Sequence, residues 1–221
     1  MGKLIVFEGI DGSGKSTQFD MMCTRLTEEK HDFKRLVFPR YSEPSSALIR
    51  MYLSGDFGKD PDSVNAYAAS SFFAVDRYAS FIRDWRDYYL SGGLILTDRY
   101  TTSNILHQGA KIPDDQREEF FSWLYTYEFD LIGLPRPDLV IYMDIDVEFA
   151  VKRLLRRQTQ TDTNADIHEN DITYLRNCAK SGEKAAAQFG WHRINCIENG
   201  TERDKNVMHT EIYEICLTKK M

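Results

Sequence analysis

The most constraining feature of this sequence is the glycine-rich stretch GIDGSGKST at residues 9–17. It matches the pattern G-x-x-x-x-G-K-[ST], follows an apolar run at 4–7, and precedes a segment with helical periodicity. Such glycines let successive backbone N–H groups turn inward, which creates an anion site at the start of a helix. We therefore expect a nucleotide phosphate-binding loop, in which Lys15 bridges the β- and γ-phosphates and the Ser16 hydroxyl binds Mg²⁺. The expected nucleotide-binding residues are Gly9, Asp11, Gly12, Ser13, Gly14, Lys15, Ser16 and Thr17.

Short apolar runs alternate with longer helical segments along the rest of the chain, which is typical of repeated βα units. The runs are almost unbroken, as expected for parallel strands that are buried on both faces. A chain of 221 residues without repeats or linkers fits a single α/β domain at 1–221, with the three-layer αβα P-loop NTPase fold. We expect its five parallel strands at 4–7, 35–38, 94–97, 139–143 and 194–197, and its helices at about 16–29, 45–53, 62–91, 113–131, 147–157, 171–189 and 205–217.

Two segments do not fit a plain stack of helices and strands. Residues 43–61 contain two prolines and two glycines and predict a loop-rich excursion before the long helix. Residues 158–170 are polar and lack apolar periodicity, so they predict a mobile surface lid.

Hydrophobic residues make up 42% and charged residues 28% of the chain. These values exclude disordered, collagen-like and coiled-coil proteins and permit an ordinary globular core. The net charge is −6 and no block of basic residues occurs, so a nucleic-acid partner is not expected. The longest apolar runs are far shorter than a membrane span, and the first one is interpreted as a strand rather than a signal peptide. The four cysteines are scattered, which predicts reduced thiols in the cytoplasm, without a disulfide or a zinc site.

Asp98 and Arg99 stand at the end of the expected third strand, beside the phosphate-binding loop. Open α/β sheets bind ligands at the carboxyl ends of their strands. Asp98 can hold Mg²⁺ together with Ser16, and Arg99 can span the donor and acceptor phosphates while charge accumulates on the transferring group. A simple Asp–Arg ion pair at a strand end is the alternative.

Arg40 follows the expected second strand in the same way. A kinase that acts on a neutral hydroxyl needs a general base near its acceptor, whereas a phosphate acceptor is already ionised and needs cations. Arg40 and Arg99 together therefore favour a phosphorylated acceptor. The alternative for Arg40 is a solvated cation in a loop.

The expected long helix carries Phe73 and Arg77 opposite an apolar stripe. Their spacing of four residues places one above the other. An aromatic ring with an arginine one turn away forms a suitable slot for a planar base. The alternative is that Phe73 packs on a second helix and Arg77 is a surface charge. The stripe itself must pack against the sheet or a partner subunit, and it comprises Val64, Tyr67, Ser71, Val75, Tyr78, Ile82, Trp85 and Tyr89.

Taken together, these motifs resemble the thymidylate kinase family, the dTMP kinases among the nucleoside monophosphate kinases. The resemblance runs over nearly the whole chain and is carried by residues 9–17, 38–40, 73–77, 98–103, 108–109 and 136–139. It implies phosphorylation of dTMP to dTDP with ATP and Mg²⁺, a step of dTTP biosynthesis, by a cytoplasmic homodimer.

The resemblance also implies roles for individual residues. Phe73 would stack on thymine, and Arg77 would donate a hydrogen bond to its O4 atom. Arg40 and Arg99 would hold the acceptor phosphate, while Asp11 would approach the 3′-hydroxyl of the sugar. Further substrate contacts would come from Ser103 and Gln108 at the far edge of the base, Tyr100 at the deoxyribose, and Glu169 in the lid.

The chain departs from the family pattern in two places. Some members carry a catalytic arginine where this chain has Gly12, and the expected lid contains neither Arg nor Lys. The compensating cation would then come from the end of the preceding helix, on lid closure. His107 stands where an aromatic ring is commoner, which predicts a more polar base pocket. The candidate cations are Arg153, Arg156 and Arg157.

Two other functions remain open on the sequence. Another P-loop deoxynucleoside or nucleoside monophosphate kinase would share the loop, but a hydroxyl acceptor is disfavoured because an arginine follows the second strand. A nucleotide-sensing ATPase module would hydrolyse ATP without regard to any acceptor.

Overall fold

A computed structural model of the chain describes residues 1–161 and 171–218, with side chains up to residue 156 and from residue 171 onward. A five-stranded, fully parallel sheet forms its centre, in the order β2-β3-β1-β4-β5. The prediction of an α/β fold with five parallel strands is confirmed. The strands are β1 (Lys3–Glu8), β2 (Phe33–Val37), β3 (Leu94–Asp98), β4 (Leu139–Asp144) and β5 (His192–Asn195).

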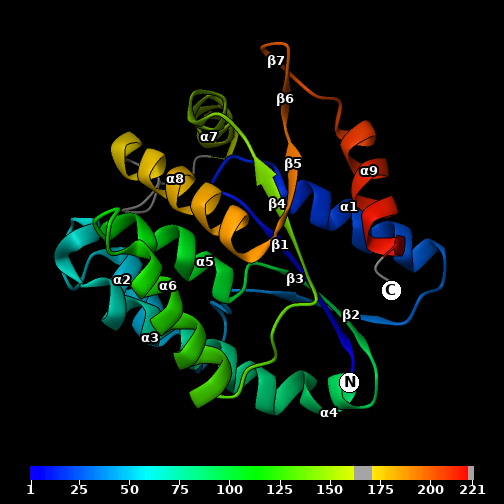
Figure 1. Cartoon of the computed structure of the whole chain (residues 1–221), viewed down its shortest axis with the longest axis horizontal. Helices are drawn as coiled ribbons and strands as arrows, with labels where there is room; N and C mark the ends of the chain where they lie inside the picture. Colours follow the sequence, from blue (N-terminus) through cyan, green and yellow to red (C-terminus); the bar gives the residue numbers. More distant parts are fainter. Residues whose placement is uncertain (162–170, 219–221) are drawn as a thin grey trace.

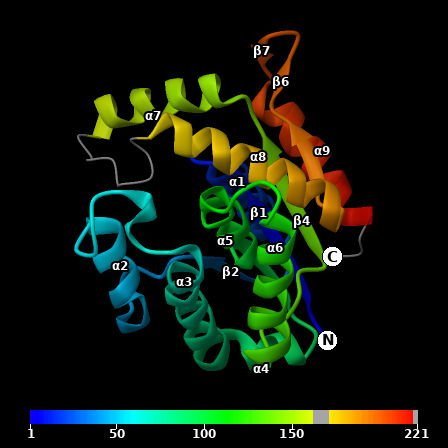
Figure 2. The ribbon, with the colours of Figure 1, turned by 60° about the vertical axis from the view of Figure 1, so that its left-hand side comes forward.

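Helices cover both faces of the sheet (Figure 1). On one face α1 and α9 pack together, and on the other α8 crosses β4 and packs on α5. In the turned view α2 and α3 lie side by side, with α7 above them (Figure 2). The helices are α1 (Lys15–Glu28), α2 (Ala47–Ser54), α3 (Ala66–Ser80), α4 (Arg86–Leu90), α5 (Thr101–His107), α6 (Arg117–Tyr125), α7 (Val147–Thr161), α8 (Ile172–Phe189) and α9 (Lys205–Thr218).

The strand order brings two loops of the site together. β1 pairs with β3 in a register that sets Phe7 opposite Asp98, and the N–H of Arg99 donates to the carbonyl of Phe7 at 3.1 Å. The loop after β1 and the turn after β3 therefore leave the same edge of the sheet side by side. The apolar residues of β1, β3 and β4 are buried on both faces, which makes this edge rigid.

The single long helix expected at 62–91 is interrupted. Pro61–Ser63 forms a separate turn, and α3 begins only after Asn65, whose side chain accepts the N–H of Ala68 at 2.9 Å as an N-cap. A π-helical turn, η3 (Phe81–Trp85), separates α3 from α4. The extra residue in such a turn shifts the helical phase, which is why the apolar stripe does not stay on one face.

Several other elements differ from the sequence expectations. The helix α5 and the hairpin β6 (Ile197–Glu198) and β7 (Thr201–Glu202) are additional, and β2 and β5 each begin two residues earlier than expected. The segment expected as one helix at 113–131 is α6 followed by a π-helical turn, η5 (Thr126–Leu131). These elements are too short to show a hydrophobic period of their own.

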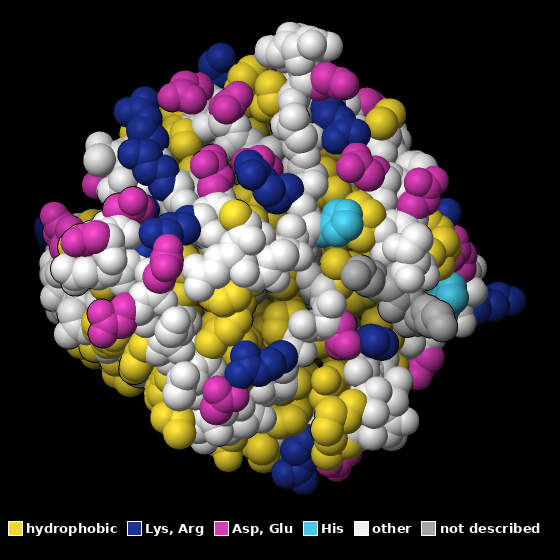
Figure 3. All heavy atoms as spheres, viewed as in Figure 1, with side chains coloured by type: hydrophobic (Ala, Val, Ile, Leu, Met, Phe, Trp, Pro, Cys, Tyr) yellow, Lys and Arg dark blue, Asp and Glu magenta, His cyan; other side chains and the backbone are white. Residues whose placement is uncertain are grey.

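The cysteines, the helix hydrophobicity and the surface charge each bear on an expectation from the sequence. All four cysteines are free thiols and buried. No helix in the described ranges is long and apolar enough to cross a bilayer. On the face shown in Figure 3, Lys and Arg side chains are interspersed with Asp and Glu.

Candidate active site

The loop between β1 and α1 has the backbone of an anion-binding nest. Gly12 and Gly14 have φ values of 81° and 90°, a region that side chains disfavour, and Gly14 is the residue that precedes α1. Lys15 is the first residue of α1 and is buried. Backbone N–H groups and an ammonium group thus converge at a helix N-terminus, where phosphate is favoured.

Helix α7 packs closely on this loop. A Cβ atom at Gly12 would lie 2.4 Å from the carbonyl oxygen of Ala150 in α7. Arg153, one turn later in α7, donates from Nη1 to the carbonyl of Ser13 at 2.9 Å, and from Nη2 to Glu202 at 2.9 Å. A side chain at position 12 therefore has no room in this arrangement. Arg153, one of the three expected cations, contacts the loop.

Ser16 and Asp98 form an oxygen pair at the base of the loop. The Ser16 hydroxyl donates to Oδ2 of Asp98 at 2.6 Å, although 82 residues separate the two. Oδ1 of Asp98 is buried and has no hydrogen-bond partner among the described residues. A buried carboxylate oxygen beside a hydroxyl is a hard-oxygen donor set, which fits Mg²⁺.

Asp11 lies between two cations. Its carboxylate is 3.4 Å from Nζ of Lys15 and also accepts a hydrogen bond from Nη2 of Arg99. Arg99 has a φ of 69°, an unusual conformation for a residue with a side chain. Burial lowers the pKa of Arg99, but the nearby carboxylates, led by Asp11 and Glu8, outweigh it and raise that pKa above its usual value. Arg99 is a permanent cation at the junction of the two halves of the site.

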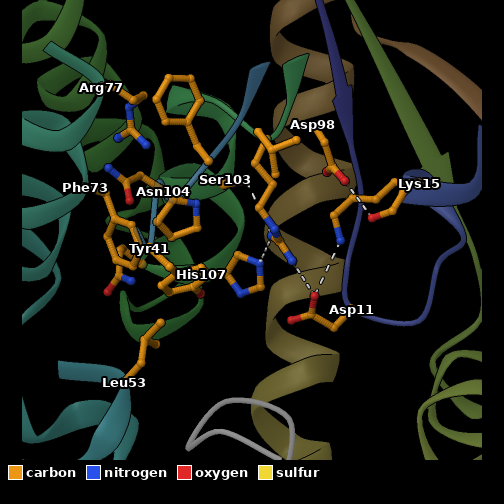
Figure 4. A pocket seen from close by; sticks show the side chains of 16 residues that line it. Asp11, Lys15, Tyr41, Leu53, Phe73, Arg77, Asp98, Ser103, Asn104 and His107 are labelled. Carbon is orange, nitrogen blue, oxygen red and sulfur yellow. Dashed lines mark hydrogen bonds and ion pairs between the residues drawn. The ribbon is translucent and has the colours of Figure 1, made fainter. Parts of the chain in front are cut away.

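A cavity of about 320 Å³ extends from this junction (Figure 4). It reaches from Asp11, Lys15 and Asp98 at one end to Phe73 and Arg77 at the other. The side chains that line it come from the phosphate-binding loop, the ends of β2 and β3, and the helices α2, α3 and α5. They are Asp11, Lys15, Ser16, Val37, Phe38, Pro39, Tyr41, Leu53, Phe73, Arg77, Asp98, Arg99, Ser103, Asn104, His107 and Gln108.

His107 is tied to Arg99 on one side and to α8 on the other. Nη1 of Arg99 lies 2.9 Å from Nε2 of His107, and Nδ1 of His107 lies 3.7 Å from the sulfur of Cys178. Because a guanidinium only donates, Nε2 accepts and the ring hydrogen belongs on Nδ1. The ring is therefore a neutral acceptor for Arg99 and makes the cavity wall more polar than a hydrocarbon ring would.

Two residues expected in the substrate site lie elsewhere. The ring of Tyr100 is fully buried in the core, where its hydroxyl donates to the carbonyl of Pro135 at 3.1 Å. Its backbone carbonyl accepts a hydrogen bond from Nη1 of Arg77 at 3.3 Å. Arg40 is not among the lining residues, because Asp84 and Ser80 hold its guanidinium. The Tyr100 ring lies in the core because it packs on apolar side chains there. The Arg40 guanidinium lies away from the cavity because the Asp84 carboxylate is nearby.

Three functional residues were not found from the sequence. Asn104 lines the cavity directly after the motif at 98–103, and Glu128 holds Arg77 from the distant turn η5. Glu8 ends β1 and accepts the N–H of Gly9 and the hydroxyl of Ser103, and its burial raises its pKa. The sequence held a signal only for Asn104, which directly follows the motif at 98–103. Glu8 and Glu128 could not be found in this way, because a single buried acid produces no periodic pattern in the sequence.

Two expected site residues fall outside the described part of the chain. Glu169 and the rest of the lid segment lie among residues 162–170, and the side chain of Arg157 is also not described.

Comparison with known proteins agrees with this geometry. The family model described as thymidylate kinase matches residues 7–212. A thymidylate kinase from Mycobacterium tuberculosis (strain H37Rv) is 29% identical over 190 residues, which cover 85% of this chain and 87% of that protein. Human thymidylate kinase is 30% identical over 69% of this chain and 65% of its own length. A solved thymidylate kinase from Candida albicans superposes with a TM-score of 0.74 at 25% identity, over 99% of this chain and 92% of that one. This protein belongs to the thymidylate kinase family, whose members are phosphotransferases with a phosphate group as acceptor.

Proposed function

We propose that this protein transfers the γ-phosphoryl group of ATP to the 5′-phosphate of dTMP, which yields dTDP and ADP. The observation that carries the proposal is the single cavity that joins the phosphate-binding loop to Phe73 and Arg77, with Arg99 at the junction. A donor nucleotide on the loop and a nucleoside monophosphate in the cavity would meet end to end at Arg99. Their reacting phosphates would then be positioned without a long diffusive search.

The chemistry needs positioning and charge neutralisation rather than a base. The acceptor oxygen of a phosphate monoester is already anionic, so no proton has to be removed before attack. Lys15 would contact the β- and γ-phosphates, and Arg99 would stabilise charge on the transferring group. Mg²⁺, held by Ser16 and Asp98, would neutralise charge on the donor phosphates. Asp11 would leave its pairing with Arg99 to approach the sugar hydroxyl of the acceptor.

The far end of the cavity has the pattern of a thymine site. Phe73 offers a ring for stacking, and Arg77 offers N–H donors for the O4 carbonyl. Asn104 contributes its carbonyl oxygen, because both of its N–H groups are already used. Gln108 lines the same cavity, and neither polar atom of its buried amide has a partner among the described residues. An unsatisfied amide of this kind costs free energy until a ligand pairs with it. Ser103 lies between this end and Arg99.

Several parts of the proposal concern motion. Arg153 lies against the loop already, and Arg157 with Glu169 would join the phosphates when the lid at 158–170 closes. Arg40 lies between Pro39 and Tyr41, both of which line the cavity. Rotation of its side chain away from Asp84 would bring it to the acceptor phosphate.

We also propose that the protein is a cytoplasmic homodimer. Four residues of the apolar stripe on α3 and η3 remain exposed on the monomer, and they fit a self-complementary interface. They are Tyr67, Val75, Tyr78 and Ile82.

The test is ADP formation from ATP and Mg²⁺ in a coupled assay, with dTMP, dUMP, UMP, dCMP, dAMP, thymidine or no acceptor. We expect rapid turnover with dTMP, weaker turnover with dUMP and none with thymidine. Turnover with thymidine would indicate a deoxynucleoside kinase instead. ATP hydrolysis that ignores every acceptor would indicate a nucleotide-sensing ATPase.

A further inference from the structure

Glu128 is a fully buried carboxylate that accepts hydrogen bonds from three side chains. It lies on η5, and its oxygens accept four hydrogen bonds from donors on the two helices α3 and α5. The donors are Nε and Nη2 of Arg77 at 2.7 and 2.6 Å, Oγ1 of Thr101 at 2.7 Å, and Nδ2 of Asn104 at 3.0 Å. Each oxygen receives two of them, so the acceptor capacity of the carboxylate is well used.

The contact fixes Arg77 as a donor in a single orientation. A bidentate pair to Glu128 uses Nε and one N–H of Nη2, and the carbonyl of Tyr100 takes one N–H of Nη1. One N–H on each terminal nitrogen then remains for the cavity that Arg77 lines. Toward the cavity, Arg77 can only donate.

The same carboxylate fixes Asn104 as an acceptor. Nδ2 of Asn104 donates to Oε1 of Glu128 and to the carbonyl of Ser70 at 3.1 Å, which uses both of its hydrogens. Turning the amide by 180° would set Oδ1 against two acceptor oxygens, which is unfavourable. Asn104 therefore keeps its carbonyl oxygen for the cavity. Figure 4 shows the amide of Asn104 directly beside the guanidinium of Arg77.

We infer that Glu128 is a positioning residue that sets the hydrogen-bond polarity of the base site, and that this polarity selects pyrimidines with a 4-oxo group and an N3–H. A donor beside an acceptor matches O4 and N3–H of such a ring. A 4-amino ring presents the opposite pattern, an N4–H donor and a bare N3 acceptor, and would leave both protein groups unpaired. The inference rests on the proposed function, because it assumes that a nucleotide base fills this end of the cavity.

The competing explanation is that Glu128 only stabilises the fold. A substitution at Thr101 distinguishes this explanation from a positioning role. Thr101 donates to Glu128 as Arg77 and Asn104 do, and it is also fully buried, but it does not line the cavity. Removing its hydroxyl weakens the same cluster without changing what the cavity presents. If Glu128 only stabilises the fold, substitutions at Glu128 and at Thr101 should change the preference for dTMP equally.

The first measurement compares dTMP with 5-methyl-dCMP on the unaltered protein. These two nucleotides share sugar, phosphate and methyl group, and differ only at position 4 and in the proton at N3. Sites that hydrogen-bond a substrate group reject analogues that lack it by about 10⁴-fold, so we expect kcat/KM to favour dTMP by at least about 10³-fold. A ratio below about tenfold would overturn the inference.

The second measurement determines the same ratio for Glu128→Gln and Thr101→Val, with the Tm of each. A Gln side chain offers one acceptor oxygen and one donor NH2 group, so it cannot keep all three hydrogen bonds that Arg77 and Asn104 donate to Glu128. Where its NH2 group faces Nδ2 of Asn104, the Asn104 amide turns and presents N–H to the cavity. We expect the dTMP preference of Glu128→Gln to fall at least about tenfold, while Thr101→Val keeps the preference despite a lower Tm. An unchanged ratio in Glu128→Gln, or an equal loss in Thr101→Val, would refute the role.

Glu128→Asp covers the case in which Glu128→Gln does not fold. It keeps a negative charge beside Arg77 but withdraws the carboxylate by one methylene from Asn104, and we again expect a reduced ratio. A full dTMP preference in Glu128→Asp would count against the inference. The proposed function fails separately, if the unaltered protein does not phosphorylate dTMP.

Discussion

At the scale of single residues, the site depends on charged side chains that are held by an opposite charge or by a neutral hydrogen-bonding group. Lys15 and Arg99 both contact Asp11, and Arg99 also contacts His107. Such preorganised groups need no reorientation as charge builds on a transferring phosphoryl group. Losing one of them should therefore affect turnover far more than folding.

Lys15→Ala and Arg99→Ala should each lower kcat with dTMP by about 10³-fold or more, because each removes a cation from the phosphates. A coupled assay gives the rates, and circular dichroism with thermal melting reports the fold. Lys180→Ala, an exposed lysine on α8, is the matched control and should retain full turnover. Near-normal rates in either site variant would contradict the proposed mechanism.

At the scale of elements, close packing between α7 and the phosphate-binding loop decides which residues the loop tolerates. Gly12 and Gly133 have nearly the same φ, 81° and 82°, in the left-handed region. A Cβ at Gly12 would collide with Ala150, whereas one at Gly133 would meet nothing within 4 Å. The pair separates the cost of a left-handed backbone from the cost of the helix contact.

Gly133→Ala should lower the free energy of unfolding by only about 1 kcal/mol, the cost of a left-handed alanine. Gly12→Ala should lose at least about 2 kcal/mol more and should weaken ATP binding, because the loop must shift away from α7. Urea unfolding and nucleotide titration measure the two quantities. Equal losses of stability in both variants would show that the α7 contact is unimportant.

Lys111 links three elements and gives stability a pH dependence. At the end of η4 (Gly109–Lys111), its ammonium donates to the hydroxyl of Tyr52 in α2 at 2.7 Å and to the carbonyl of Val64 at 3.0 Å. Burial lowers the pKa of Lys111 to about 8, although Asp62 nearby partly opposes the shift. Between this pKa and that of an unfolded lysine, about 10.4, the unfolded chain binds more protons, so this group makes stability rise with pH.

Lys111→Met should remove that contribution. From pH 8 to pH 10, the free energy of unfolding of the unaltered protein should rise by about 2 kcal/mol relative to Lys111→Met. Denaturant unfolding of both proteins across this window measures the difference, in which other titrating groups cancel. A difference that stays constant with pH would show that Lys111 is not desolvated in the folded state.

At the scale of the whole molecule, the apolar stripe of the long helical segment divides between two environments. Trp85 and Tyr89 are buried against the core, whereas Val75 and Tyr78 are 52% and 44% exposed. The π-helical turn η3, which follows the exposed pair and ends at Trp85, is what redirects the stripe. The exposed half is the surface that the proposed homodimer would bury.

Val75→Glu should convert a homodimer into a monomer, because it would set a charge at a two-fold apolar interface. Sedimentation velocity measures the state. Val207→Glu is the control: Val207 is similarly exposed but lies on α9, which packs with α1 rather than α3, and this variant should remain a dimer. A monomeric unaltered protein at micromolar concentration would contradict the proposed assembly.

The sequence by itself determined the parts of this protein that depend on neighbours along the chain. The loop at 9–17 lies between a strand and a helix as its glycines and its flanking apolar runs predict, and five parallel strands follow from five almost unbroken apolar runs. Burial on both faces was predicted correctly for β1, β3 and β4 but not for the edge strands β2 and β5, which are largely accessible. The slot formed by Phe73 and Arg77 also came from local spacing, since residues four apart share one helix face. In each case the physical signal lies within a few residues.

Tertiary structure alone decided which distant groups meet. Glu128 reaches Arg77 across 51 residues of sequence, and Ser16 reaches Asp98 across 82. Tyr100 turned into the core and Arg40 toward Asp84, although both follow strands whose ends form the site. A buried charge or ring takes the partner that burial makes most favourable, and that partner is known only when the chain has folded.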